Sequence, residues 1–221
     1  MNNLKARLAN SHLYLVTGQE SANGRATPEV VEAALKGGVD IVQLREYSLK
    51  DSQLLQAARA LRVLTRRFKA LFIVNNRPDI ALLSEADGVH LGQDDLPVAE
   101  ARKIIGWDKI VGVSTHALEQ ARKAVADGAD YIGVGPVFST PTKAGRSPVT
   151  VEYVRQIVAL KPALPFFAIG GIDLSNVGEV LAAGAERVAV VRAIMGASDP
   201  EKAAKELKKK LGNAVPVSAH S

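Results

Sequence analysis

Cysteine is absent from this chain of 221 residues, and aromatic residues make up only 5% of it. The absence of cysteine excludes disulfides, thiolate metal sites and thiol nucleophiles, so any metal ion must be held by oxygen or imidazole ligands. The chain also lacks an apolar run approaching the roughly 20 residues that a membrane helix needs, and residues 1–10 lack the apolar core of a secretory signal. We therefore expect a cytoplasmic enzyme with no membrane partner.

The net charge of +5 could suggest nucleic-acid binding. Few aromatic side chains are available for stacking, however, and the basic residues are spread over expected helices, such as 59–67 and 202–210. This pattern is typical of solvated helix faces. We expect no nucleic-acid partner, and the positive charge suits a small phosphorylated substrate.

Short apolar runs that end in a polar or glycine cluster recur along the chain, and segments with apolar residues at helical spacing alternate with them. The expected strands are 13–17, 39–44, 71–74, 88–91, 109–113, 131–134, 165–169 and 187–191. The expected helices are 28–36, 51–68, 78–84, one opened by Pro97, 117–126, 150–160, 174–183 and 200–211. This alternation predicts an α/β fold with a single (β/α)8 TIM barrel domain over residues 1–212, rather than an open doubly wound sheet. Residues 213–221 are expected to form a disordered tail.

Two loops at the predicted carboxyl face of the barrel indicate phosphate binding. Gly170-Gly171 follows the seventh expected strand, and Val191-Arg192 leads from the eighth into an expected helical turn. Backbone N–H groups can hold an anion there, because glycine lets the main chain approach it and a helix N-terminus attracts it. The alternative is that Gly171 only permits a tight turn.

Gln43 and Arg45 lie two residues apart at the end of the second expected strand, so their side chains project to the same side. At the barrel mouth, the guanidinium of Arg45 could bind phosphate oxygens through two parallel hydrogen bonds. The alternative is a structural ion pair between Arg45 and Glu46 at the rim.

Asn75-Asn76 and Asp95 follow the third and fourth expected strands. Oxygen ligands from two adjacent strands, near a phosphate, suit Mg²⁺. This pattern indicates Mg²⁺ as a cofactor. The alternative is that Asn76 and Asp95 cap the helices that follow them.

The connection 135–148 is longer than the usual two to six residues between a strand and a helix, which is typical of functional loops. Its segment 139–145 has hydroxyl groups and one lysine that could close over a diphosphate, although an ordinary solvated turn is the alternative. A proton-transfer role for His116 stays open, because histidine titrates near neutral pH. His90, within a strand, is expected to be packed and satisfied.

These residues belong to longer motifs that are specific in combination. They are Gln43-Leu44-Arg45-Glu46, Asn75, the segments 88–95 and 112–116, Gly135-Pro136-Val137-Phe138 with Thr140-Pro141-Thr142-Lys143, and Ile169-Gly170-Gly171-Ile172. On these motifs the chain resembles the thiamine phosphate synthase family over about residues 13–200.

The resemblance implies a transferase of thiamine biosynthesis. It would condense 4-amino-2-methyl-5-hydroxymethylpyrimidine diphosphate with a thiazole phosphate, carboxylated or not, to thiamine phosphate and diphosphate. In this family the pyrimidine diphosphate ionises to a carbocation, which the thiazole nitrogen attacks. The residues implied to hold the pyrimidine diphosphate are Gln43, Arg45, Asn75, Ser114 and Lys143, with Arg45, Ser114 and Lys143 as catalytic residues. Those implied to hold the thiazole phosphate are Thr140, Thr142, Gly171, Val191 and Arg192, and Asn76 and Asp95 would bind Mg²⁺.

Three positions depart from the family pattern. Tyr47 stands at a substrate-binding position where the family usually has lysine, which removes one positive charge. Asn76 replaces an aspartate and keeps an oxygen ligand with less negative charge. Arg192 replaces a serine and adds positive charge beside the predicted phosphate site.

Two other functions fit parts of this pattern. The related thiazole tautomerases share the barrel and use a histidine at the position of His116, and the changes at Tyr47 and Asn76 favour them. A catalytically silent barrel that binds a phosphate ligand is the second alternative. We favour the synthase because an isomerase has less reason to keep Asp95 and Lys143. The formation of a homo-oligomer is left open.

Overall fold

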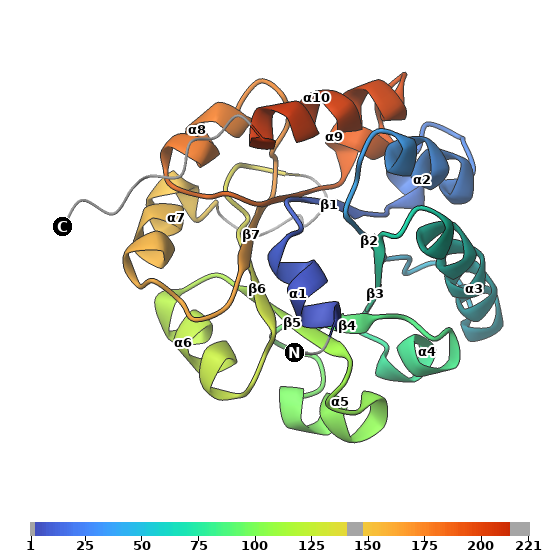
Figure 1. Cartoon of the computed structure of the whole chain (residues 1–221), viewed down its shortest axis with the longest axis horizontal. Coiled ribbons are helices and arrows are strands. Elements are labelled where there is room, and N and C mark those ends of the chain that lie inside the picture. Colours follow the sequence, from blue (N-terminus) through green and yellow to red (C-terminus); the bar gives the residue numbers. More distant parts are fainter. Residues whose placement is uncertain (1–2, 141–147, 213–221) are drawn as a thin grey trace.

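The chain forms a closed barrel of parallel strands in the computed structural model, which describes residues 3–140 and 148–212. Each strand pairs with its neighbours in sequence, and β8 pairs with β1 to close the barrel (Figure 1). The strands are β1 (Leu13–Val16), β2 (Ile41–Leu44), β3 (Leu71–Asn75), β4 (Gly88–Leu91), β5 (Ile110–Thr115), β6 (Tyr131–Val134), β7 (Phe166–Ile169) and β8 (Val188–Val190). The predicted (β/α)8 TIM barrel is confirmed.

Helices form a ring around the barrel, and each strand leads into one or more of them (Figure 1). They are η1 (Gln19–Ser21), α2 (Thr27–Lys36), α3 (Asp51–Arg67), α4 (Pro78–Leu83), α5 (Val98–Ile105), α6 (Leu118–Ala126), α7 (Thr150–Ala159), α8 (Val177–Ala182), α9 (Arg192–Met195) and α10 (Pro200–Gly212). None of the helices in the described residues combines the length and the hydrophobicity that a membrane span requires. The tail predicted at 213–221 lies outside the described residues.

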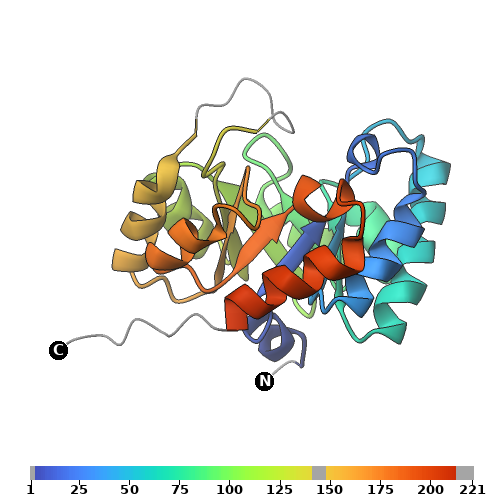
Figure 2. The same ribbon diagram turned by 90° about the horizontal axis from the view of Figure 1, so that it is seen from above.

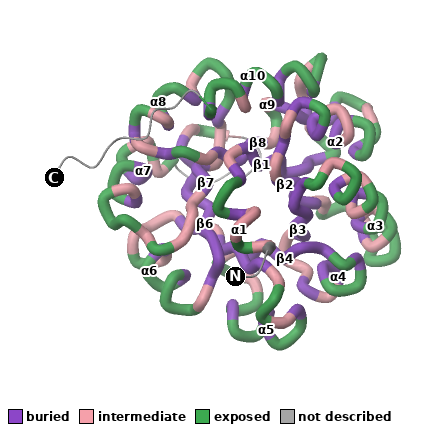
Figure 3. The backbone as a smooth tube through the Cα atoms, in the orientation of Figure 1, coloured by how far each residue is buried: buried purple, intermediate pink, exposed green. Residues whose placement is uncertain are grey.

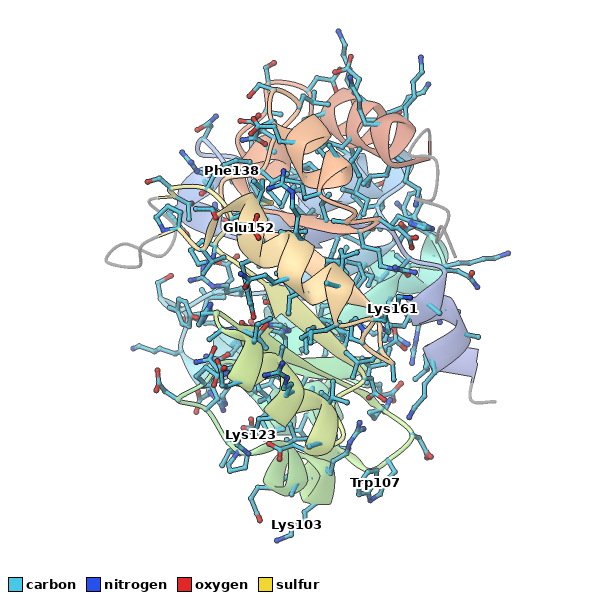
Figure 4. All side chains as sticks on the ribbon, turned by 90° about the vertical axis from the view of Figure 1, so that its left-hand side faces the viewer. Lys103, Trp107, Lys123, Phe138, Glu152 and Lys161 are labelled. Atoms are coloured by element: carbon cyan, nitrogen blue, oxygen red, sulfur yellow. The ribbon has the colours of Figure 1, made fainter. Side chains whose placement is uncertain are left out.

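A short helix that the sequence analysis did not predict, α1 (Asn3–Ala9), covers the amino-terminal end of the barrel (Figure 2). Its Leu8 is buried and joins the apolar cluster inside the barrel, and Leu4 packs against the same cluster. Figure 4 shows the two ends of the molecule: Phe138, which follows β6, lies at the end away from α1, and Lys161, which follows α7, lies at the end near it. The loops that follow the strands therefore face away from α1.

The strands are buried on both sides (Figure 3). The outward-facing residues, such as Val42 and Phe72, belong to the large apolar cluster between the barrel and the helices. The inward-facing residues, such as Ile41, Ile73 and Phe167, belong to a smaller cluster inside the barrel. Successive residues of a strand alternate between the two clusters. One inward-facing residue in a strand therefore shows which of its neighbours also face the barrel interior.

Three aspartates stabilise the amino-terminal end of the barrel, and each immediately precedes an even-numbered strand. The Asp130 carboxylate accepts a hydrogen bond from Val111 N–H at 2.8 Å and another from the buried Arg102 guanidinium at 2.6 Å. The same arrangement of carboxylate, backbone donor and cation occurs in Asp40 with Leu13 and Lys208 and in Asp87 with Phe72 and Arg62. This end of the barrel is thus occupied by structural ion pairs.

Candidate active site

The carboxyl-terminal half of the barrel encloses a cavity of about 270 Å³. Every strand contributes to its wall through inward-facing residues, for example Tyr14 from β1, Gln43 from β2 and Phe167 from β7. The cavity lies at the end where (β/α)8 enzymes carry their active sites.

Most of the residues predicted for the site line this one cavity. Those in its wall are Gln43, Arg45, Asn75, Ser114, Thr140, Gly171, Val191 and Arg192, together with His116. Tyr47, Asn76 and Asp95 are not part of the wall. Thr142 and Lys143 lie outside the described residues, as do all of residues 141–147 of the predicted functional loop.

The two glycines after β7 have backbone conformations that disfavour other residues. Gly170 has φ of 101° and Gly171 has φ of 65°. A Cβ atom at Gly171 would lie 2.8 Å from both the Phe138 Cβ and the Ser139 carbonyl oxygen. Glycine is therefore required at position 171 for the turn itself and for its close packing on the loop after β6. Phe138 N–H also donates to the Gly170 carbonyl at 3.0 Å, which holds the two loops together.

Arg45 and Asn75 meet at the rim of the cavity through Tyr47. The Arg45 guanidinium carbon lies 4.6 Å from the centroid of the Tyr47 ring, and Asn75 Nδ2 donates to the Tyr47 hydroxyl at 3.3 Å. The Tyr47 side chain is 66% exposed and borders the cavity from outside. Cation–π contacts of this kind restrict where a guanidinium lies.

The alternative of an Arg45–Glu46 ion pair is wrong within the described part of the chain, where no carboxylate lies within ion-pair distance of Arg45. Glu46 instead accepts hydrogen bonds from Thr17 Oγ1 at 2.9 Å and from Gln19 N–H at 3.1 Å. Thr17 Oγ1 in turn accepts from Arg45 N–H at 3.0 Å. Burial raises the pKa of the Glu46 carboxyl, so its environment disfavours the charged form.

Asn76 and Asp95 lie at the ends of the neighbouring strands β3 and β4. Asn76 N–H donates to the His90 carbonyl at 2.8 Å, and Asp95 Oδ2 accepts from Gly92 N–H at 2.5 Å. The helix-capping alternative is wrong, because the residue at the N-cap of α4 is Arg77 and that of α5 is Pro97. Among residues 3–140 and 148–212, no cluster of three or more histidine, aspartate or glutamate side chains is placed to hold a metal ion.

Polar side chains form a continuous chain of hydrogen bonds across the floor of the cavity. Gln43 Nε2 donates to the Tyr14 hydroxyl at 2.6 Å, and the Tyr14 and Tyr131 hydroxyls lie 2.9 Å apart. The Tyr131 hydroxyl lies 2.9 Å from His90 Nδ1, and His90 Nε2 lies 2.9 Å from Ser114 Oγ. His90 is packed and hydrogen-bonded, as predicted, but it also lines the cavity. Tyr14 and Tyr131 were missed, although their alternation with outward-facing apolar residues already placed them inside a barrel.

His116 is held by the backbone around it. Its Nδ1 contacts the Gly135 carbonyl oxygen, and its backbone N–H donates to Gln120 Oε1 at 2.7 Å. Since a carbonyl oxygen only accepts, this contact requires a proton on Nδ1.

A sequence model of the family described as thiamine monophosphate synthase matches residues 13–194, which includes every strand of the barrel. The chain belongs to this family. The match covers each cavity-lining residue named above.

Several thiamine monophosphate synthase relatives resemble the chain over most of its length. It is 53% identical to a thiamine-phosphate synthase of Synechocystis over 92% of this chain and 58% of the relative. It is 50% identical to one of Halalkalibacterium halodurans over 85% of this chain and 89% of the relative. The chain thus spans less than two-thirds of the length of the Synechocystis relative.

A solved structure shows the same fold. It is a thiamine phosphate pyrophosphorylase from Pyrococcus furiosus, with a TM-score of 0.86 and 38% sequence identity. The similarity covers 96% of this chain and 100% of that one.

Proposed function

We propose that the chain catalyses the condensation of 4-amino-2-methyl-5-hydroxymethylpyrimidine diphosphate with a thiazole phosphate. The bond between the pyrimidine methylene carbon and the diphosphate oxygen breaks, the thiazole nitrogen forms a new bond to that carbon, and diphosphate leaves. The single observation that carries the proposal is that one cavity contains Arg45, Ser114 and Gly171, which the family resemblance assigns to both substrates. Relatives named thiamine-phosphate synthase, about half identical to this chain, support it.

The reaction needs electrostatic stabilisation more than covalent help from the protein. Negative charge builds up on the departing diphosphate as the carbon–oxygen bond breaks. Arg45 would meet that charge at the rim of β2, and the Ser114 hydroxyl would donate a hydrogen bond from the floor of the cavity. Lys143 would add a second positive charge from the loop after β6.

The second substrate would bind on the opposite part of the wall. Gly171 and Val191 lie at the ends of β7 and β8, and Arg192 begins α9. Their backbone N–H groups and the Arg192 guanidinium would hold the thiazole phosphate, with Thr140 and Thr142 beside it. Both reactants would then be held in line within one small cavity.

Mg²⁺ fits the donor set at the ends of β3 and β4. One carboxylate, from Asp95, and one amide oxygen, from Asn76, are ligands that Mg²⁺ accepts when substrate phosphates and water complete its coordination. When bound, Mg²⁺ supplies positive charge that offsets the charge of the leaving group.

The direct test is diphosphate release from the chain mixed with both substrates and Mg²⁺. We expect turnover that EDTA abolishes and added Mg²⁺ restores. Arg45→Ala and Asp95→Ala should each lower kcat/KM by about 10²-fold or more, since each removes a charge-assisted contact to the diphosphate or its metal. Arg66→Ala, which removes an exposed arginine of α3, is the matched control and should leave turnover unchanged.

The same assay separates the synthase from the alternatives. A thiazole tautomerase would depend on His116 more than on Arg45, so His116→Ala would abolish activity and Arg45→Ala would spare it. A silent phosphate-binding barrel would bind inorganic phosphate but release no diphosphate. The Synechocystis and Halalkalibacterium halodurans relatives are named as synthases, which favours a larger loss of activity in Arg45→Ala than in His116→Ala.

A further inference from the structure

The chain of hydrogen bonds on the cavity floor joins five strands. It runs from Gln43 on β2 through Tyr14 on β1, Tyr131 on β6 and His90 on β4 to Ser114 on β5. Strands β1 and β6 are not neighbours, so the two tyrosine hydroxyls meet across the barrel interior. The hydrogen-bond chain therefore connects two predicted substrate-binding residues, Gln43 and Ser114, through three residues that have no assigned role.

The orientation of the Gln43 amide, whose nitrogen faces the Tyr14 hydroxyl, gives this hydrogen-bond chain one direction. Gln43 Nε2 can only donate, so the Tyr14 hydroxyl accepts from it and gives its own hydrogen to Tyr131. The Tyr131 hydroxyl then gives its hydrogen to His90 Nδ1. A neutral imidazole that accepts at Nδ1 carries its hydrogen on Nε2, which donates to Ser114 Oγ. In the opposite direction, the hydrogen of the buried Tyr14 hydroxyl would have no acceptor in the chain.

The side chains that form the hydrogen-bond chain are held rigidly. Tyr14, Gln43 and Tyr131 are almost completely buried, and burial raises the pKa of both tyrosines, so both hydroxyls keep their hydrogens at neutral pH. The Tyr131 ring occupies the space over Gly112, where a Cβ atom would lie 2.0 Å from the ring. The backbone of Ser114 is also fixed, because Gln93 Nε2 donates to its carbonyl at 2.6 Å.

We infer that His90 is a positioning residue, held as its Nε2-protonated tautomer by Tyr131, which leaves the Ser114 hydroxyl hydrogen directed into the cavity. Because Ser114 Oγ already accepts from His90, its own hydrogen is available to a ligand. This inference rests on the proposed function only for the identity of that ligand, the departing diphosphate. A donor that is oriented before the reaction begins costs no reorganisation when negative charge develops.

The tautomer can be measured without any turnover. In protein labelled with ¹⁵N-histidine, long-range proton–nitrogen spectra distinguish an imidazole protonated on Nε2 from one protonated on Nδ1. The signals of His90 are assigned by replacing the other histidines one at a time. We expect His90 to be neutral and protonated on Nε2, and protonation on Nδ1 instead would overturn the inference whether or not the chain is a synthase.

Tyrosine-to-phenylalanine variants test whether the hydrogen-bond chain sets the tautomer of His90. Tyr131→Phe removes the donor to His90 Nδ1, so the Nδ1-protonated form should appear in the spectrum. Tyr14→Phe leaves that donor in place and should preserve the wild-type tautomer. Tyr153→Phe is the matched control, because Tyr153 is also buried but its hydroxyl bonds to the Ala117 carbonyl and to Thr115 Oγ1, neither of which lines the cavity. An unchanged His90 spectrum in folded Tyr131→Phe would overturn the inference.

Kinetics link the tautomer to Ser114. Tyr131→Phe should lower kcat about tenfold with less effect on KM, because the lost orientation matters most where charge develops. In a Ser114→Ala background the same change should lower kcat by less than about twofold, since the two residues would act through one hydrogen bond. Equal effects in both backgrounds would show that Tyr131 acts independently of Ser114. If no diphosphate is released at all, the proposed function fails while the tautomer measurement still decides the inference.

Discussion

The guanidinium of Arg45 lies over the ring of Tyr47, with 4.6 Å between the guanidinium carbon and the ring centroid. Tyr47 is also hydrogen-bonded to Asn75, so one exposed tyrosine contacts two residues of the cavity wall. The family resemblance places a lysine at this position, which would contribute a charge. In this chain the aromatic ring instead keeps the charge of Arg45 at the rim.

Replacement of Tyr47 should therefore weaken binding of the pyrimidine diphosphate. An exposed cation–π contact is worth about 0.5–1 kcal/mol, so Tyr47→Ala should raise the KM for this substrate about two- to fivefold. Tyr47→Phe keeps the ring and should have a smaller effect. Steady-state kinetics at saturating thiazole phosphate measure both, and equal KM values for Tyr47→Ala and the wild type would contradict this role.

Gly171 should tolerate no side chain. Its φ of 65° costs an L-residue about 1–2 kcal/mol, and the added Cβ would collide with Phe138 and Ser139. We expect Gly171→Ala to lower the free energy of unfolding by at least that amount and to weaken binding of the thiazole phosphate. Gly178→Ala, at an exposed position of α8 with no atom within 4 Å of the new Cβ, should instead raise stability by up to about 1 kcal/mol. Denaturant unfolding and calorimetric titration provide the two measurements, and full ligand affinity in Gly171→Ala would argue against a phosphate contact there.

Asp130 should matter for stability and not for catalysis. Its carboxylate is bonded to Arg102 and to Val111 N–H at the end of the barrel away from the cavity. Removal of one partner from such a buried pair costs about 3–5 kcal/mol, because the other charge stays buried. Asp130→Ala should lower the free energy of unfolding by this amount and leave kcat unchanged at temperatures where the variant is folded.

Glu100→Ala, which breaks an exposed ion pair with Lys103, is the control for Asp130 and should cost no more than about 1 kcal/mol. A loss of similar size in the two variants would contradict the structural role of Asp130.

Glu46 should make the stability of the chain depend on pH. Burial raises its pKa in the folded state above the ordinary value of 4.5, so the folded state binds the proton more tightly than the unfolded state does. The resulting contribution to stability is fully present below pH 4.5 and is lost as the pH rises through the folded-state pKa. Glu46→Gln, which cannot ionise, should lack this component. Urea unfolding of both proteins between mildly acidic and neutral pH measures it, and parallel pH profiles would contradict the prediction.

The sequence by itself determined the barrel and the end of it that carries the site. Apolar runs and helical spacing are local signals, and each strand ends where the chain turns to a polar or glycine cluster, as at Asn75 and Gly170. Parallel strands place those ends on one face, so the sequence alone assigns residues such as Arg45 and Arg192 to one site. Helix α1 was missed because its seven residues provide only Leu4 and Leu8 as a periodic signal.

Only the tertiary structure decided how the side chains meet inside the barrel. Closure brings Tyr14 within 2.9 Å of Tyr131, although the two residues are 117 positions apart in the chain. It also assigns Glu46 to Thr17 instead of Arg45, and puts Tyr47 under the Arg45 guanidinium. Such contacts depend on strand register, tilt and the space left by residues such as Gly112, and these quantities are set by the packing of the whole barrel rather than by any local segment.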